Sequence, residues 1–134
     1  MATSKIIKNV PLLTVVKVLG PGTTTIDLRD LKTSTQDFDR GNVKVNINTI
    51  YYTANGFITY SRNSNVILKT EGSDNWFFSA ASGIVLDEDN NANITVTFNN
   101  GSDGSVILAL SKVAGYSPNV ALGADGVQEF ISGN

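Results

Sequence analysis

The chain has 134 residues, with 10 Lys and Arg, 12 Asp and Glu, a formal net charge of −2, and neither His nor Cys. The lack of His and Cys removes the most frequent general base, the thiol nucleophile and the soft metal ligands, so an enzyme is the weaker expectation. No cluster of Lys and Arg provides the basic surface that a nucleic-acid backbone requires. The length fits a single domain with one core.

The first 20 residues are only partly apolar. Lys8, Asn9, Pro11 and Lys17 interrupt the apolar stretch, which is too broken for the core of a signal peptide or for a membrane-spanning helix. We therefore expect a soluble protein that has no leader and no membrane partner.

Alternating apolar and polar residues predict the first strands. Residues 5–20 form two short extended pieces divided by Pro11, with Leu13 and Val15 on one face. Residues 23–31 then alternate with a period of two, which is typical of a half-buried strand.

The middle of the chain predicts a meander of short strands. A strand over residues 43–52 runs toward Asn55-Gly56, a dipeptide that favours a tight hairpin turn because both positions tolerate positive φ. Residues 57–61 would then be the returning strand, and polar turns are expected at 62–65 and 71–74.

The strongest alternation lies on both sides of the polar loop 99–104. It predicts a hairpin between residues 94–98 and 106–110, central to the sheet. The residues expected to face one core are Ile94, Val96, Phe98, Val106, Leu108 and Leu110.

No segment has a capped helical period of ten or more residues. Short strands separated by regular turns predict an all-β fold, an antiparallel β-sandwich or a jelly-roll-like domain. We expect a single β-domain over residues 1–134, in which a β-core at 14–116 lies between extended N-terminal and C-terminal arms at 1–13 and 117–134.

The densest acidic cluster is the turn at residues 87–91, where side-chain oxygens at alternate positions are suitable Ca²⁺ ligands. The weak candidate ligands are Asp87, Asp89 and Asn91. Relative to an EF-hand loop, however, Ala92 replaces the required Gly and Phe98 replaces the closing bidentate Glu. We favour a solvated turn, and we expect neither a metal nor another cofactor.

Aromatic side chains offer a second candidate site. Alternation places one member of each pair, Tyr51–Tyr52 and Trp76–Phe77, inside the fold and the other outside. For the aromatic side chains as a set, we expect core packing first, a subunit interface second and a sugar-stacking platform third. Because no His is present to activate a Ser, we assign no catalytic residue.

Apolar residues at both chain ends lack the alternation that would bury them in one sheet. Exposed on a monomer they would form a patch that soluble proteins usually avoid, so we expect them to contact other subunits. The predicted interface residues are Ile6, Ile7, Leu12, Val120, Leu122, Phe130 and Ile131. The alternative is that both ends fold back over the open edges of the sandwich.

Seven short stretches between about Val15 and Tyr116 follow one another in a characteristic order: TVVKVLG, TTTIDL, VKVNINTI, ITYSRN, WFFS, DEDNNANITVTF and SVILALSKVAGY. In their order and spacing they resemble a group of small proteins encoded by tailed bacteriophages, notably marine podovirus-like phages. The resemblance implies a virion component similar in size to capsid decoration proteins, and it carries no catalytic motif.

We therefore expect a non-enzymatic virion structural protein, a capsid decoration protein that binds the outer capsid surface and stabilises the shell. The partners implied are the major capsid protein and further copies of this chain, forming a homo-oligomer on a virion assembled in the host cytoplasm. A tail, fibre-base or head-tail accessory subunit is the alternative. A carbohydrate-binding module is a more remote one.

Overall fold

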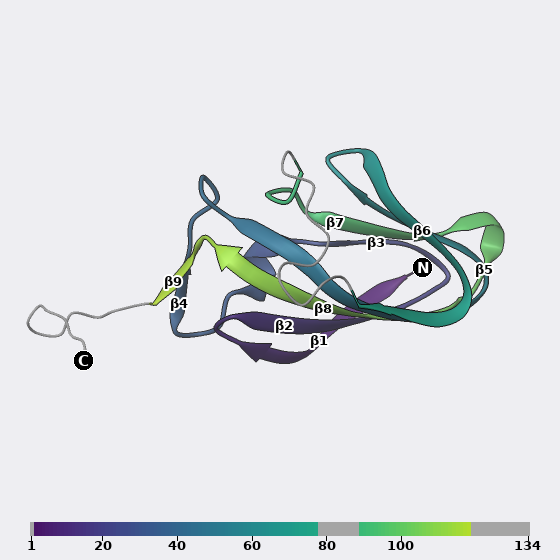
Figure 1. Cartoon of the computed structure of the whole chain (residues 1–134), viewed down its shortest axis with the longest axis horizontal. Helices are drawn as coiled ribbons and strands as arrows, with labels where there is room; N and C mark the ends of the chain where they lie inside the picture. The colour runs from purple at the N-terminus through teal and green to yellow at the C-terminus, as the bar shows by residue number, and fades with distance from the viewer. Residues whose placement is uncertain (1, 78–88, 119–134) are drawn as a thin grey trace, which may run out of the picture.

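The computed structural model describes residues 2–77 and 89–118, which form a curled antiparallel sheet whose two halves face each other across one hydrophobic core (Figure 1). Its elements are β1 (Thr3–Val10), β2 (Leu13–Leu19), β3 (Gly22–Ile26), η1 (Leu28–Leu31), β4 (Gln36–Phe38), β5 (Lys44–Arg62), β6 (Asn65–Phe77), β7 (Ile94–Phe98), η2 (Asn99–Gly101), β8 (Gly104–Ala114) and β9 (Tyr116–Pro118). The predicted all-β, sandwich-like fold is confirmed. Among the described elements, no helix has the length and apolar character needed to cross a membrane.

The main sheet has seven strands in the order β1-β2-β8-β5-β7-β3, with β6 paired to β5 off this path, while β4 and β9 form a separate pair. The long strand β5 belongs to both halves of the sheet. It pairs with β8 over Lys44–Ala54 and with β7 over Ile58–Arg62. Its pairing with β6 is interrupted between Thr53 and Phe57, where a bulge lets the sheet fold over.

The hairpin predicted at Asn55-Gly56 is wrong, because β5 continues through both residues. The two residues lie instead at the corner of the sheet, where they contact the segment just before β8. The Asn55 backbone N–H donates to the Asp103 carbonyl (3.1 Å), and its side-chain oxygen accepts from the Asp103 N–H (2.7 Å). A Cβ at Gly56 would lie 2.7 Å from the Ser102 Cβ, so only Gly permits this close approach.

The turn expected at residues 62–65 is confirmed as the hairpin that joins β5 and β6. Asn63 (φ 51°) and Ser64 (φ 65°) form a two-residue turn with both φ values positive, as tight hairpins of this kind require. The turn expected at 71–74 does not occur, since β6 runs through these residues and stays paired with β5.

The hairpin predicted between residues 94–98 and 106–110 is also wrong. β7 lies between β3 and β5, and β8 lies between β2 and β5, so the two strands occupy different halves of the curled sheet (Figure 1). The predicted core face is confirmed: all six residues are at most 3% exposed. The six side chains point into the same core although β7 and β8 do not pair, because the two halves of the sheet face each other across that core.

On β2, Leu13 and Val15 share one face, as predicted, and this is the outer face, which also carries the exposed Lys17. Val16 and Val18 occupy the buried face, and Val16 pairs with the buried Leu108 of β8.

Residues 1–13, the predicted N-terminal arm, include the edge strand β1. It pairs with β2 from Thr3–Leu19 to Val10–Leu13, as in the alternative in which the chain ends cover the sheet edges. Of the predicted C-terminal arm at 117–134, the structure describes only Ser117 and Pro118, in β9.

Candidate functional site

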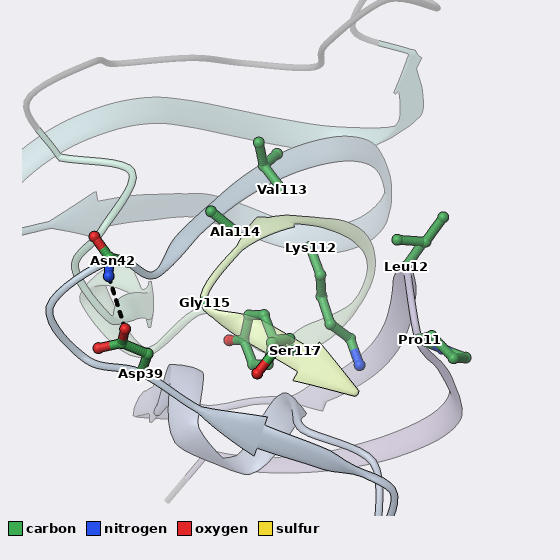
Figure 2. A pocket seen from close by; sticks show the side chains of 10 residues that line it. Pro11, Leu12, Asp39, Asn42, Lys112, Val113, Ala114, Gly115 and Ser117 are labelled. Atoms are coloured by element: carbon green, nitrogen blue, oxygen red, sulfur yellow. Dashed lines mark hydrogen bonds between the residues drawn. The ribbon is translucent and has the colours of Figure 1, made fainter. Parts of the chain in front are cut away.

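A cleft of about 300 Å³ opens at the end of the sandwich where β4 and β9 pair; we call it the end cleft (Figure 2). The β1–β2 turn, the loop after β4 and the junction of β8 with β9 enclose it. The junction requires Gly115, whose φ is +90° and whose added Cβ would lie 2.4 Å from the Val43 Cα. Its carbonyl accepts from the Asp39 N–H (2.9 Å), which brings the loop after β4 to the cleft.

The cleft contains a buried cation. Lys112 is only 5% exposed, and its ammonium group donates to the side-chain oxygens of Asn9 (2.7 Å) and Gln36 (3.2 Å) and to the Leu31 carbonyl (2.5 Å). All three acceptors are neutral, and desolvation by burial lowers the pKa of Lys112 to about 8. The ammonium group therefore uses its three N–H donors to join β1, η1 and β4 to β8.

The groups around Lys112 are themselves hydrogen-bonded. The Thr14 hydroxyl donates to the Asn9 side chain (2.8 Å), and the Gln36 amide donates to the Pro11 carbonyl (2.8 Å). The Tyr116 ring lies 5.3 Å from the Lys112 ammonium group, and its hydroxyl donates to a carbonyl of η1 (2.5 Å). Burial raises the pKa of Tyr116, so this hydroxyl stays protonated. This network holds the end of the sandwich together. Within it, no Ser or Thr hydroxyl is hydrogen-bonded to the Lys112 amine.

The pKa of Lys112 predicts how stability depends on pH. The folded pKa of about 8 lies below the ordinary value of 10.5, so between these values the unfolded chain binds more protons and stability rises with pH. We expect the free energy of unfolding to increase by about 2 kcal/mol between about pH 7 and about pH 9.5. Urea denaturation across this range measures the slope.

Two variants isolate that slope. Lys112→Met should remove the increase, whatever its effect on absolute stability, whereas Lys17→Met, at an exposed position of the same sheet, should keep it. An unchanged slope in Lys112→Met would assign the pH dependence to another group.

Exposed apolar side chains lie at and beside the end cleft. Leu12 and Val113 line the cleft and are 75% and 56% exposed, and Val10, at the end of β1 next to Pro11, is 40% exposed; we call these three residues the end patch. Leu12 and Val113 point away from the Lys112 ammonium group (Figure 2). The Lys112 backbone N–H donates to the Leu12 carbonyl (3.0 Å), which holds the β1–β2 turn against β8.

Three of the predicted interface residues lie in the hairpin formed by β1 and β2. Ile6 and Ile7 are partly exposed on β1, with Ile7 in a bulge, and Leu12 is in the turn. The other four, Val120, Leu122, Phe130 and Ile131, lie outside the described residues. Lys5, Lys8 and the bulge disfavour the addition of another strand to the β1 edge. A partner at this end would therefore meet side chains rather than the free backbone of β1.

The acidic turn differs from the solvated turn we predicted. Asp89 is buried, and its carboxylate accepts hydrogen bonds from the side-chain amides of Asn63 (3.4 Å) and Asn65 (3.2 Å). Asn91 is exposed, and Asp87 lies outside the described residues. Within residues 2–77 and 89–118, no three His, Cys, Asp or Glu side chains are grouped so that they could hold a metal.

Arg62 holds the turn at 89–92 against β5, a role that was not predicted from the sequence. Its guanidinium group is buried and donates to the carbonyls of Val45 (2.6 Å), Asn90 (2.9 Å) and Ala92 (2.8 and 3.0 Å). Burial lowers the pKa of Arg62 to about 10, against the opposing effect of Asp89. Alternation could have indicated this position, because Arg62 follows Ile58 and Tyr60 at a spacing of two and both of those residues are buried.

The Tyr51–Tyr52 pair divides as alternation predicts, with Tyr51 45% exposed and Tyr52 buried. Of the Trp76–Phe77 pair, Trp76 is exposed and donates its indole N–H to the Tyr52 hydroxyl (3.1 Å), while the Phe77 side chain lies outside the described part of the structure. Tyr60 is buried, and burial raises the pKa of Tyr60, which is hydrogen-bonded to Thr70, to about 12.

No protein-family profile matches the chain, and no curated protein matches it. KdgF from Halomonas sp. is 12% identical with a TM-score of 0.39, and the match covers 84% of this chain and 82% of that one. A conserved protein with a double-stranded β-helix domain from Klebsiella pneumoniae is 10% identical (TM-score 0.39; coverage 87% and 78%). A cupin superfamily protein from Desulfitobacterium hafniense is 6% identical (TM-score 0.35; coverage 85% and 79%). Similarity at this level bears on neither activity nor partners.

Proposed function

We propose that this protein is a non-enzymatic structural subunit of a tailed-phage particle, a capsid decoration protein that binds the outer capsid surface and stabilises the shell. The observation that carries the proposal is the end patch, where a large apolar side chain, Leu12, is exposed on a turn held in place by hydrogen bonds. A preorganised apolar anchor loses little conformational entropy on binding.

The polar groups of the end cleft support a structural role. Lys112 and Arg62 are the two buried cations of the described residues, and both bond to neutral oxygens that join separate segments of the fold. Such groups stabilise a rigid scaffold.

The major capsid protein and further copies of this chain are the proposed partners. A patch of three side chains gives a modest interface, but a shell presents the same site many times, and each bound copy stabilises the assembled state by mass action. Because the β1 edge is protected, we expect each copy to bind the capsid through its side chains and not to extend its sheet into that of a neighbouring copy.

Copy number in purified particles tests the proposal. A decoration protein should be present at a level comparable to that of the major capsid protein, as measured by quantitative mass spectrometry. A few to a few dozen copies would favour the alternative, a tail, fibre-base or head-tail accessory subunit. Absence from the particle would overturn both.

Leu12→Asp tests the end patch directly. Because Leu12 is largely exposed, the variant should fold normally, but a charge in place of the anchor should weaken attachment to particles at least about tenfold. Co-sedimentation with particles stripped of the protein measures attachment. Val66→Asp, at a position 64% exposed on β6, is the matched control and should attach like the unaltered chain. Equal attachment of both variants would remove the end patch from the interface.

A further inference from the structure

A second hollow, shallow and about 370 Å³ in volume, lies on the outer face of the sheet where β6, β5 and β8 run side by side; we call it the outer groove. Tyr51 of β5 pairs with Ile107 of β8 on one side and with Asn75 of β6 on the other. Thr53 pairs with Ser105 in the same way. The pairing register therefore sets an aromatic ring and an aliphatic side chain between polar groups on one face.

The outer groove carries unused hydrogen-bonding groups. Within the part of the chain that the structure describes, the side-chain amide of Asn75 and the hydroxyl of Ser105 have no hydrogen-bond partner. Asp74 also borders the groove, but it pairs with the buried Tyr52, so its side chain lies on the opposite face of the sheet, where one carboxylate oxygen accepts from the Asn75 backbone N–H (2.8 Å). An amide and a hydroxyl thus lie beside Tyr51, which is 45% exposed.

We propose that the outer groove binds a neutral pyranose ring of a glycan. A pyranose has a face of C–H groups, which fits the Tyr51 ring and Ile107, and an edge of hydroxyls, which fits Asn75 and Ser105. An apolar ligand would cover the amide and the hydroxyl without bonding to them. Among the described residues no Lys or Arg lines the groove, so a phosphorylated ligand would find no countercharge there.

The outer groove is separate from the end patch. On β8, Ser105 lies in the groove and Ser111 pairs with Leu13 beside the β1–β2 turn, which places the two sites about 20 Å apart along the strand. One copy of the protein can therefore hold a capsid at one site and a sugar at the other. Sugar binding does not depend on the function proposed above, and the two are tested separately.

The test is an NMR titration of the full chain with methyl β-D-glucopyranoside, methyl β-D-galactopyranoside and N-acetylglucosamine. We expect at least one of these probes to shift backbone amide resonances of the groove saturably, with a millimolar dissociation constant, since a single shallow ring site buries little surface. The resonances expected to shift are those of Tyr51, Thr53, Asp74, Asn75, Ser105 and Ile107.

Variants separate stacking from general surface effects. Tyr51→Ala should weaken binding of that probe at least about tenfold, Tyr51→Phe should retain binding, and Asn75→Ala should weaken it. Phe57→Ala, at another exposed aromatic residue of β5, is the matched control and should bind like the unaltered chain. The proposal is overturned if none of the three sugars shifts the groove resonances, or if Tyr51→Ala and Asn75→Ala bind as well as Phe57→Ala. It is also overturned if Tyr51→Ala impairs particle attachment but not sugar binding, because the groove would then be a protein interface.

Discussion

Val96→Asp should prevent folding. Val96 is fully buried at the centre of β7, between Thr24 of β3 and Tyr60 of β5. An aspartate there would place a carboxylate without a countercharge in the core, at a cost of several kcal/mol or more, which is comparable to the roughly 5–15 kcal/mol that stabilises a domain of this kind. Far-UV circular dichroism and dispersion of the amide NMR spectrum measure the outcome.

Two controls show that the charge, and not the position, causes this loss. Val96→Ala should fold and lose about 1–3 kcal/mol of stability through the cavity it leaves. Thr97→Asp, at the next residue on the outward face, should also fold. A cooperative, native-like unfolding transition in Val96→Asp would contradict the assignment of this face to the core.

Arg62→Met should lower the free energy of unfolding by about 3–5 kcal/mol, because it removes the guanidinium donors to the carbonyls of Val45, Asn90 and Ala92. Of these three, the Asn90 carbonyl keeps the hydrogen bond from the Val45 backbone N–H (2.9 Å). Urea denaturation measures the loss. We expect it to be concentrated at the turn of residues 89–92, which hydrogen exchange of its amides would show as faster local opening.

Arg40→Met is the matched control, because Arg40 forms an exposed ion pair with Asp27 (3.2 Å) in which both side chains are about half exposed. Exposed pairs contribute about 0–1 kcal/mol, so this variant should be close to the unaltered chain in stability. Equal losses in the two variants would mean that the buried hydrogen bonds of Arg62 contribute no more than a surface pair.

The end patch and the two clefts differ in how far they could be predicted. Leu12 was recognisable as an exposed apolar residue because it follows Pro11, which ends the pairing of β1 with β2. The end cleft was not predictable, because Lys112 bonds to Asn9, Leu31 and Gln36, which lie 76 to 103 positions earlier in the chain. In the sequence Lys112 is one more charge at the end of a strand. The same holds for Arg62, whose carbonyl partners lie 17 to 30 positions away in the chain.

The sequence by itself determined the all-β class, the core faces of β7 and β8 and the turn at Asn63-Ser64. All three follow from alternation and local backbone preference, which act between neighbouring residues. Only the tertiary structure decided which strands pair. Asn55-Gly56 has the local preference of a turn, yet it lies in an unbroken strand because Ser102 and Asp103 bond and pack against it at the sheet corner. Strand partners, buried cations and the two clefts depend on contacts between segments far apart in the chain, and a period-two pattern reports the face of a strand but not its neighbour.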